Sequence, residues 1–180
     1  MMKLLRHKIF LLVSILCGFM LIFSSCRTKS KIPYPGNHTV RHEVVGYTGK
    51  LHGDRKRIVE EACEWIGTPY KYAGAEKYVG ADCSGMVLRV YESVTSIKLP
   101  RNSAKQSEFC KSLKRSEVKP GDLVFFATGK SPDRISHVGI MIDEDAFVHS
   151  STKRGVVIAS VSSPYFQKTF MGFGRVPGMK

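Results

Sequence analysis

The sequence has few acidic residues and no apolar run long enough for an ordinary membrane span. It contains 15 Asp and Glu against 28 Lys and Arg, a formal net charge of +13 at pH 7. Such an excess favours anionic partners such as wall polymers, lipid headgroups or nucleic acid, although it equally serves solubility. The longest uncharged apolar stretch, Ile9–Phe23, has 15 residues, short of the roughly 20 that a spanning helix needs.

This short stretch is instead typical of a signal peptide. Basic residues precede it, and Ser24-Ser25-Cys26 follows it, as small residues do before a cleavage site. The pattern looks like the processing site of bacterial lipoproteins, so we expect residues 1–25 to be removed and Cys26 to be acylated. Several acyl chains would anchor the protein stably in a membrane. A retained signal anchor or ordinary cleavage nearby stays open, and export argues against a nucleic-acid partner.

The sequence also lacks an even set of cysteines for a disulfide framework. Of its five cysteines, Cys17 lies in the signal and Cys26 at the processing site. The remaining three, Cys63, Cys83 and Cys110, are an odd set, so at least one thiol is unpaired. A bridge between Cys63 and Cys110 is one option, and burial as small apolar side chains is the ordinary alternative.

The remaining chain has the length of one domain, residues 53–180, preceded by a tether of residues 26–52 without apolar periodicity. Helical spacing predicts helices over 54–66, with Asp54 as N-cap, and over 83–94 and 103–109. Residues 68–80 show neither helical nor strand period and predict a loop. Pro120-Gly121 fits a type II turn. The strands expected after it are 122–126, 137–142, 146–150, 155–159 and 171–176, with a helical turn over 164–168. Helices followed by an antiparallel meander predict the α+β class.

The motif Asp82-Cys83-Ser84-Gly85 places a thiol at the start of a predicted helix. The positive end of the helix dipole and the free backbone N–H groups favour thiolate over thiol there. The N–H of Cys83 would suit a developing oxyanion, and Asp82 would cap the helix. A purely structural cysteine is the alternative reading of this motif.

Two histidines on neighbouring predicted strands give the cysteine a possible base. If Ile142 pairs with Ala146 across the reversal, His149 becomes the diagonal neighbour of His137 on one face of the sheet. His137 would then take the proton of Cys83, and His149 would orient His137. Two strand histidines without a task are the alternative. Zinc ligation by Cys83, His137 and His149 matches no compact spacing, so we expect no metal and no cofactor.

The order of the motifs resembles the NlpC/P60 family of cell-wall cysteine peptidases, over roughly residues 56–177. The matching blocks are Gly67-Thr68-Pro69-Tyr70, Asp82-Cys83-Ser84-Gly85, Leu99-Pro100-Arg101, residues 119–126, residues 136–140 and residues 147–150. The resemblance implies a papain-like fold, with N-terminal helices packed on a five- to six-stranded antiparallel sheet. It looks closest to the small lipoprotein murein endopeptidases of Gram-negative envelopes.

The resemblance also implies a reaction, cleavage of peptidoglycan stem peptides. Family members cut the bond between γ-D-glutamate and diaminopimelate or the D-alanyl cross-link to diaminopimelate. By position, Cys83 matches the nucleophile, His137 the base and His149 the third polar residue. Tyr70 matches a tyrosine that helps bind the oxyanion or packs under the loop. Asp82 and Ser84 match positions that meet the substrate or cap the helix.

One block departs from the family. Ala73-Gly74 stands where many members have two glycines, and the loop over 75–80 is particular to this chain. We assign Arg101 no part in the chemistry.

The expected protein is a monomer, lipid-anchored at Cys26, that faces the periplasm from the outer membrane. An N-acetylmuramoyl-L-alanine amidase, a transferase of the same fold and a non-catalytic wall-binding lipoprotein are the alternatives.

Overall fold

The computed structural model describes residues 51–179. The predicted signal peptide, Cys26 and almost all of the tether lie outside this range. The helices are α3 (Gly53–Glu64), α4 (Cys83–Val94), α5 (Ser103–Phe109) and α6 (Pro164–Thr169), with a 3-10 turn η1 (Arg115–Glu117). The strands are β1 (Ala75–Glu76), β2 (Gly80–Ala81), β3 (Lys111–Leu113), β4 (Leu123–Phe126), β5 (His137–Met141), β6 (Ala146–Ser151), β7 (Gly155–Ser160) and β8 (Phe170–Arg175). The α+β prediction is confirmed.

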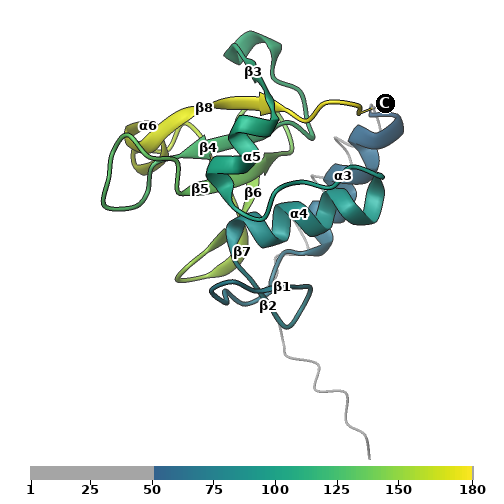
Figure 1. Ribbon diagram of the computed structural model, residues 1–180, viewed down its shortest axis with the longest axis horizontal. Coiled ribbons are helices and arrows are strands. Elements are labelled where there is room, and N and C mark those ends of the chain that lie inside the picture. The colour runs from purple at the N-terminus through teal and green to yellow at the C-terminus, as the bar shows by residue number, and fades with distance from the viewer. Residues whose placement is uncertain (1–50, 180) are drawn as a thin grey trace, which may run out of the picture. The chain divides into compact units, whose positions relative to one another are not determined.

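The main sheet has six strands in the order β3-β8-β4-β5-β6-β7, and every neighbouring pair is antiparallel. Figure 1 shows α4 running beside this sheet, with α6 at the beginning of β8 on the left of the view. The meander predicted after the Pro120-Gly121 turn therefore forms the sheet. Its end strand β3 was not predicted, because three residues with one buried side chain, Leu113, carry no readable period.

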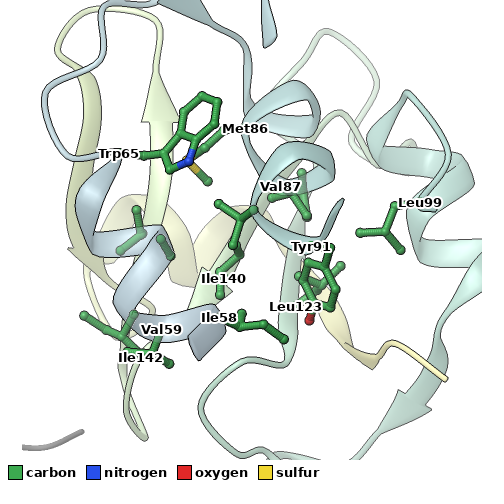
Figure 2. Close-up of a cluster of buried hydrophobic side chains, with 14 of the residues drawn as sticks. Ile58, Val59, Trp65, Met86, Val87, Tyr91, Leu99, Leu123, Ile140 and Ile142 are labelled. Atoms are coloured by element: carbon green, nitrogen blue, oxygen red, sulfur yellow. The ribbon is translucent and has the colours of Figure 1, made fainter. Parts of the chain in front are cut away.

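Central strand β4 is buried on both faces, which divides the core into two clusters. Alternate residues of a strand point to opposite faces. Leu123 and Phe125 join the cluster under α3 and α4, whereas Val124 and Phe126 join a second cluster on the other face. Figure 2 shows the first cluster, where side chains of the two helices meet those of the sheet. The second contains a group of phenylalanines, among them Phe166 of α6.

Two local predictions were wrong. The first helix begins at Gly53 with His52 as N-cap, so Asp54 lies inside the first turn. There its carboxylate accepts a bond from Arg57 Nη2 at 2.5 Å and faces the positive end of the helix, which stabilises this earlier start. The loop predicted over 68–80 includes the two-residue strand β1 and the first residue of its partner, the two-residue strand β2. Such strands are too short to show a sequence period.

The turn at Pro120-Gly121 is confirmed, and it introduces a buried carboxylate. Gly121 has φ 87°, and the N–H of Asp122 donates to the carbonyl of Lys119 at 3.0 Å, as a type II turn requires. Asp122 is fully buried and accepts bonds from Arg55 (3.1 Å) and Arg175 (2.7 and 2.9 Å). These pairs connect α3 and β8 to the turn before β4 through one carboxylate.

The three cysteines of the described range, Cys63, Cys83 and Cys110, are thiols, so the bridge between Cys63 and Cys110 does not form. Among residues 51–179, no helix combines the length and apolar character that crossing a bilayer requires.

Candidate active site

Cys83 is the first residue of α4, where its capping residue fixes the backbone. The Asp82 carboxylate accepts a bond from the N–H of Gly85 at 2.7 Å, which confirms Asp82 as the N-cap. The thiol of Cys83 lies 4.0 Å from the carbonyl oxygen of Ser136. The sulfur therefore sits beside the beginning of β5, next to the residue that precedes His137.

The two histidines meet as the predicted pairing required. Ile140 pairs with Val148 and Met141 with Phe147, a register that makes His149 the diagonal neighbour of His137. Nε2 of His137 lies 2.9 Å from Nδ1 of His149, and the rings are nearly perpendicular, at 85°. Because Nε2 of His137 is occupied by this bond, Nδ1 is the nitrogen left to accept a proton from the thiol.

The pKa values of Cys83, His137 and His149 do not favour the thiolate that the sequence predicted. Burial, joined by the negative charge of Asp82, raises the pKa of Cys83 to about 11, although nearby backbone N–H groups oppose this. Burial lowers the pKa of His137 to about 4. Burial, followed by the charges of His137 and Arg154, lowers the pKa of His149 to about 3. At neutral pH the thiol and both imidazoles are therefore neutral, so the helix start alone does not ionise Cys83.

Arg101, to which the sequence assigned no role, holds the turn that carries the thiol. Its guanidinium bonds both oxygens of Asp82 at 2.9 Å. It also donates to the hydroxyl of Ser84 at 3.0 Å and to the carbonyl of Gly74 at 3.2 Å. Asp82 and Ser84, predicted to cap or to meet substrate, are thus both engaged with Arg101 in this structure.

Tyr70, the remaining predicted site residue, lies at the edge of the same turn. It forms a parallel bridge with Ala81, immediately before the capping residue. Burial raises the pKa of its hydroxyl, and the neighbouring Cys83 and Asp82 raise it further. Tyr70 is therefore close enough to the nucleophile turn to sense its charge.

Phenylalanines of the second core cluster, on the sheet face of Val124 and Phe126, pack against the histidine pair. Phe166 of α6 lies 5.2 Å from the ring of His149 and 6.4 Å from the ring of His137. Sequence reasoning missed both Phe166 and Arg101. Arg101 lay in a quoted motif block, but its partners are 17 to 27 residues away along the chain. Phe166 lies in a six-residue helix without any motif.

Comparison with known proteins identifies a family and relatives of this chain. The family model described as the NlpC/P60 family matches residues 67–175. The chain is 39% identical over 119 residues to a "Probable endopeptidase" of Haemophilus influenzae, which covers 66% of this chain and 73% of that protein. It is 39% identical over 122 residues to the "Murein DD-endopeptidase MepS/Murein LD-carboxypeptidase" of Escherichia coli K12, covering 68% of this chain and 63% of that protein.

A solved structure shares the fold. The crystal structure of an NlpC/P60 family protein from Bacillus cereus superposes with a TM-score of 0.63 at 28% sequence identity. The superposition covers 68% of this chain but only 40% of that one. The chain therefore matches less than half of that protein's length.

Proposed function

Because the chain belongs to the NlpC/P60 family, we propose that it is a murein endopeptidase that works through a thiol. It hydrolyses stem-peptide or cross-link amide bonds that involve diaminopimelate. The observation that carries the proposal is the 2.9 Å contact between Nε2 of His137 and Nδ1 of His149, with the sulfur of Cys83 4.0 Å from the carbonyl oxygen of Ser136, the residue before His137. The name of the Escherichia coli relative supports murein as the substrate, and the name of the Haemophilus influenzae relative supports an endopeptidase.

The geometry supports a covalent mechanism with proton transfer during attack. Because Cys83 is a neutral thiol in the free enzyme, its proton passes to Nδ1 of His137 as the sulfur bonds to the amide carbon. The backbone N–H of Cys83 and the Tyr70 hydroxyl are the candidates for stabilising the oxyanion. The His137 imidazolium then gives the proton to the leaving amine, and the C–N bond breaks. Water, deprotonated by His137, then attacks the thioester carbon. The C–S bond breaks, and the leaving sulfur of Cys83 takes the proton back from His137, which restores the free enzyme.

His149 has a positioning role in this mechanism. Its Nδ1 lies 2.9 Å from Nε2 of His137, so it holds the plane of the base beside the thiol. As a neutral partner it lacks the charge that a carboxylate would offer to the imidazolium. Its contribution is therefore orientation and tautomer control rather than charge stabilisation.

Digestion of purified peptidoglycan by the full chain in detergent, with mass analysis of the products, tests the activity and the bond cut. Loss of cross-linked dimers with intact monomers indicates cross-link cleavage. Monomers shortened to L-alanyl-D-glutamate place the cut after γ-D-glutamate, and release of whole stem peptides indicates the amidase. New conjugates with an added amine acceptor would indicate a transferase. Cys83→Ala should abolish any turnover, and full activity of that variant would reject the mechanism.

A matched control is available in Cys110→Ala. Cys110 is also a partly buried thiol with a raised pKa, about 12, and it follows α5 rather than the nucleophile turn. We expect this variant to cut peptidoglycan as the wild type does. If the wild-type protein is folded and leaves peptidoglycan uncut, the result would favour a non-catalytic wall-binding lipoprotein.

We also propose the attachment of this domain to the envelope. Residues 1–25 act as a lipoprotein signal, Cys26 is acylated, and residues 26–52 tether a monomeric domain of residues 53–180 to the outer membrane, facing the periplasm. The apolar stretch before Ser24-Ser25-Cys26 supports this arrangement. Metabolic labelling with a fatty acid should mark the wild type and not Cys26→Ser, and equal labelling of both would reject Cys26 as the site. Membrane fractionation and light scattering test the location and the monomer.

A further inference from the structure

The imidazole of His149 packs against aromatic rings, and within residues 51–179 one of its nitrogens has no polar partner. The residue is 4% exposed, and among the described residues its Nε2 finds no hydrogen-bonding atom. The ring of Phe166 lies 5.2 Å away at 82°, and that of Phe147 lies 5.1 Å away at 36°. A buried polar nitrogen without a partner is uncommon and requires an explanation.

The missing partner bears directly on which tautomer the histidine pair adopts. A neutral imidazole carries one N–H and one lone pair. If His137 donates from Nε2 to Nδ1 of His149, its own Nδ1 is free to accept the thiol proton, and the proton of His149 lies on Nε2. In the reverse arrangement, Nδ1 of His137 is protonated and cannot act as a base, while Nε2 of His149 is a lone pair.

Tautomers, rather than protonation states, are the relevant alternatives at neutral pH. Burial lowers the pKa of both imidazoles, to about 4 for His137 and about 3 for His149. The charged group that acts on His149 besides its partner is Arg154, which also disfavours the protonated ring. Both rings are therefore neutral, and their surroundings decide where each single proton lies.

Aromatic rings distinguish these two states of Nε2. The face of a phenyl ring is negative, so it attracts an N–H and repels a lone pair. Phe166 is nearly perpendicular to His149 and nearly parallel to His137, at 19° and 6.4 Å. It also packs on Phe126 and Phe147, at 4.7 and 4.8 Å, which fixes its position.

We propose that Phe166 is a positioning residue that selects the base-competent tautomer of His137 and His149 by accepting the Nε2–H of His149 on its ring face. The proposal rests on the proposed function of His137 as the base. Phe166 touches neither substrate nor thiol in this scheme and acts through His149.

The test is the tautomeric state of His149, read by long-range 1H–15N NMR of the full chain in detergent with 15N-labelled histidine at pH 7. In the wild type we expect the proton of His149 on Nε2. Phe166→Leu keeps an apolar side chain but removes the ring face. We expect it to reduce the Nε2-protonated population and to lower kcat about three- to fivefold with KM unchanged. Phe166→Tyr keeps the ring, so we expect the Nε2-protonated population of His149 and kcat to stay at their wild-type values.

Phe173→Leu is the matched control. Phe173 belongs to the same buried cluster, but its ring packs on Phe170 at 4.8 Å rather than on a histidine. It should lower thermal stability as Phe166→Leu does and leave the tautomer and kcat unchanged. An unprotonated Nε2 in the wild type overturns the proposal, even if Phe166→Leu fails to fold. Identical tautomers and kcat in the two leucine variants also overturn it. Because the spectrum needs no substrate, a wild type that leaves peptidoglycan uncut would be a separate failure.

Discussion

Arg101 stabilises the nucleophile turn through charge as well as through hydrogen bonds. Asp82 is needed as the helix cap, yet its carboxylate raises the pKa of the adjacent Cys83. The bidentate contact of Arg101, at 2.9 Å to each oxygen, offsets this negative charge next to the thiol. Such a compensating pair allows a carboxylate to cap the helix that carries the nucleophile without suppressing the thiolate further.

Arg101→Gln should therefore make Cys83 harder to ionise. At pH 8 we expect alkylation of Cys83 by iodoacetamide to slow about threefold, which corresponds to a rise of about 0.5 in the pKa of Cys83. The effect is modest because the pair of Arg101 and Asp82 is partly exposed to solvent. Mass spectrometry of the Cys83 peptide measures the rate. Lys105→Gln removes an exposed cation of α5, paired with Glu108, and serves as the control. Adding Asp82→Asn, which still caps a helix, should cancel the effect of Arg101→Gln. An unchanged rate in the single variant would contradict charge compensation.

At the scale of elements, α4 and the loop before it are held together at a glycine. A Cβ on Gly85 would lie 2.2 Å from the carbonyl oxygen of Gly74. That carbonyl accepts bonds from Asp82 N and from Arg101. The close approach therefore places the loop that contains β1 and β2 directly against the nucleophile turn.

Gly85→Ala should reverse the usual effect of alanine in a helix. In an exposed helix the change stabilises by up to about 1 kcal/mol, but here the methyl group must displace backbone. We expect a loss of about 1–3 kcal/mol in the free energy of unfolding together with reduced turnover, measured by urea denaturation and peptidoglycan digestion. Gly129→Ala is the control. Its Cβ would lie 3.3 Å from the side-chain hydroxyl of Ser136, a longer contact to a side-chain atom rather than to the backbone. Equal stability of the two alanine variants would argue against a tight contact at Gly85.

What the sequence could predict depended on how local each signal was. The bounds of α4 and α5 were predicted correctly because capping by Asp82 and Asn102 acts within three residues. The meeting of His137 and His149 was predictable because a short reversal fixes its own register. Arg101 and Phe166 were missed because their contacts depend on the packing of distant segments. Strands β1 to β3, of two or three residues, have no period to read.

At the scale of the whole molecule, the histidine pair makes folding sensitive to acid. His137 and His149 lie on the sheet face that holds the phenylalanine cluster, where burial disfavours their charged forms. In the unfolded chain these two histidines bind protons below about pH 6.5, whereas in the folded chain His137 binds its proton only below about pH 4 and His149 below about pH 3. The unfolded state therefore holds more protons over this window, and stability must fall as pH falls through it.

We therefore expect the free energy of unfolding to be steady above about pH 7 and to decrease between pH 6.5 and 4. Each buried histidine contributes a loss of the order of 2–3 kcal/mol, because one pKa unit corresponds to about 1.4 kcal/mol. Urea denaturation at pH 7.5 and pH 4.5 measures the decrease. His149→Gln removes one of the two titrating groups and should shrink the difference between the two pH values by about half. The same difference in wild type and variant would mean that the acid sensitivity arises from other titrating groups of the chain.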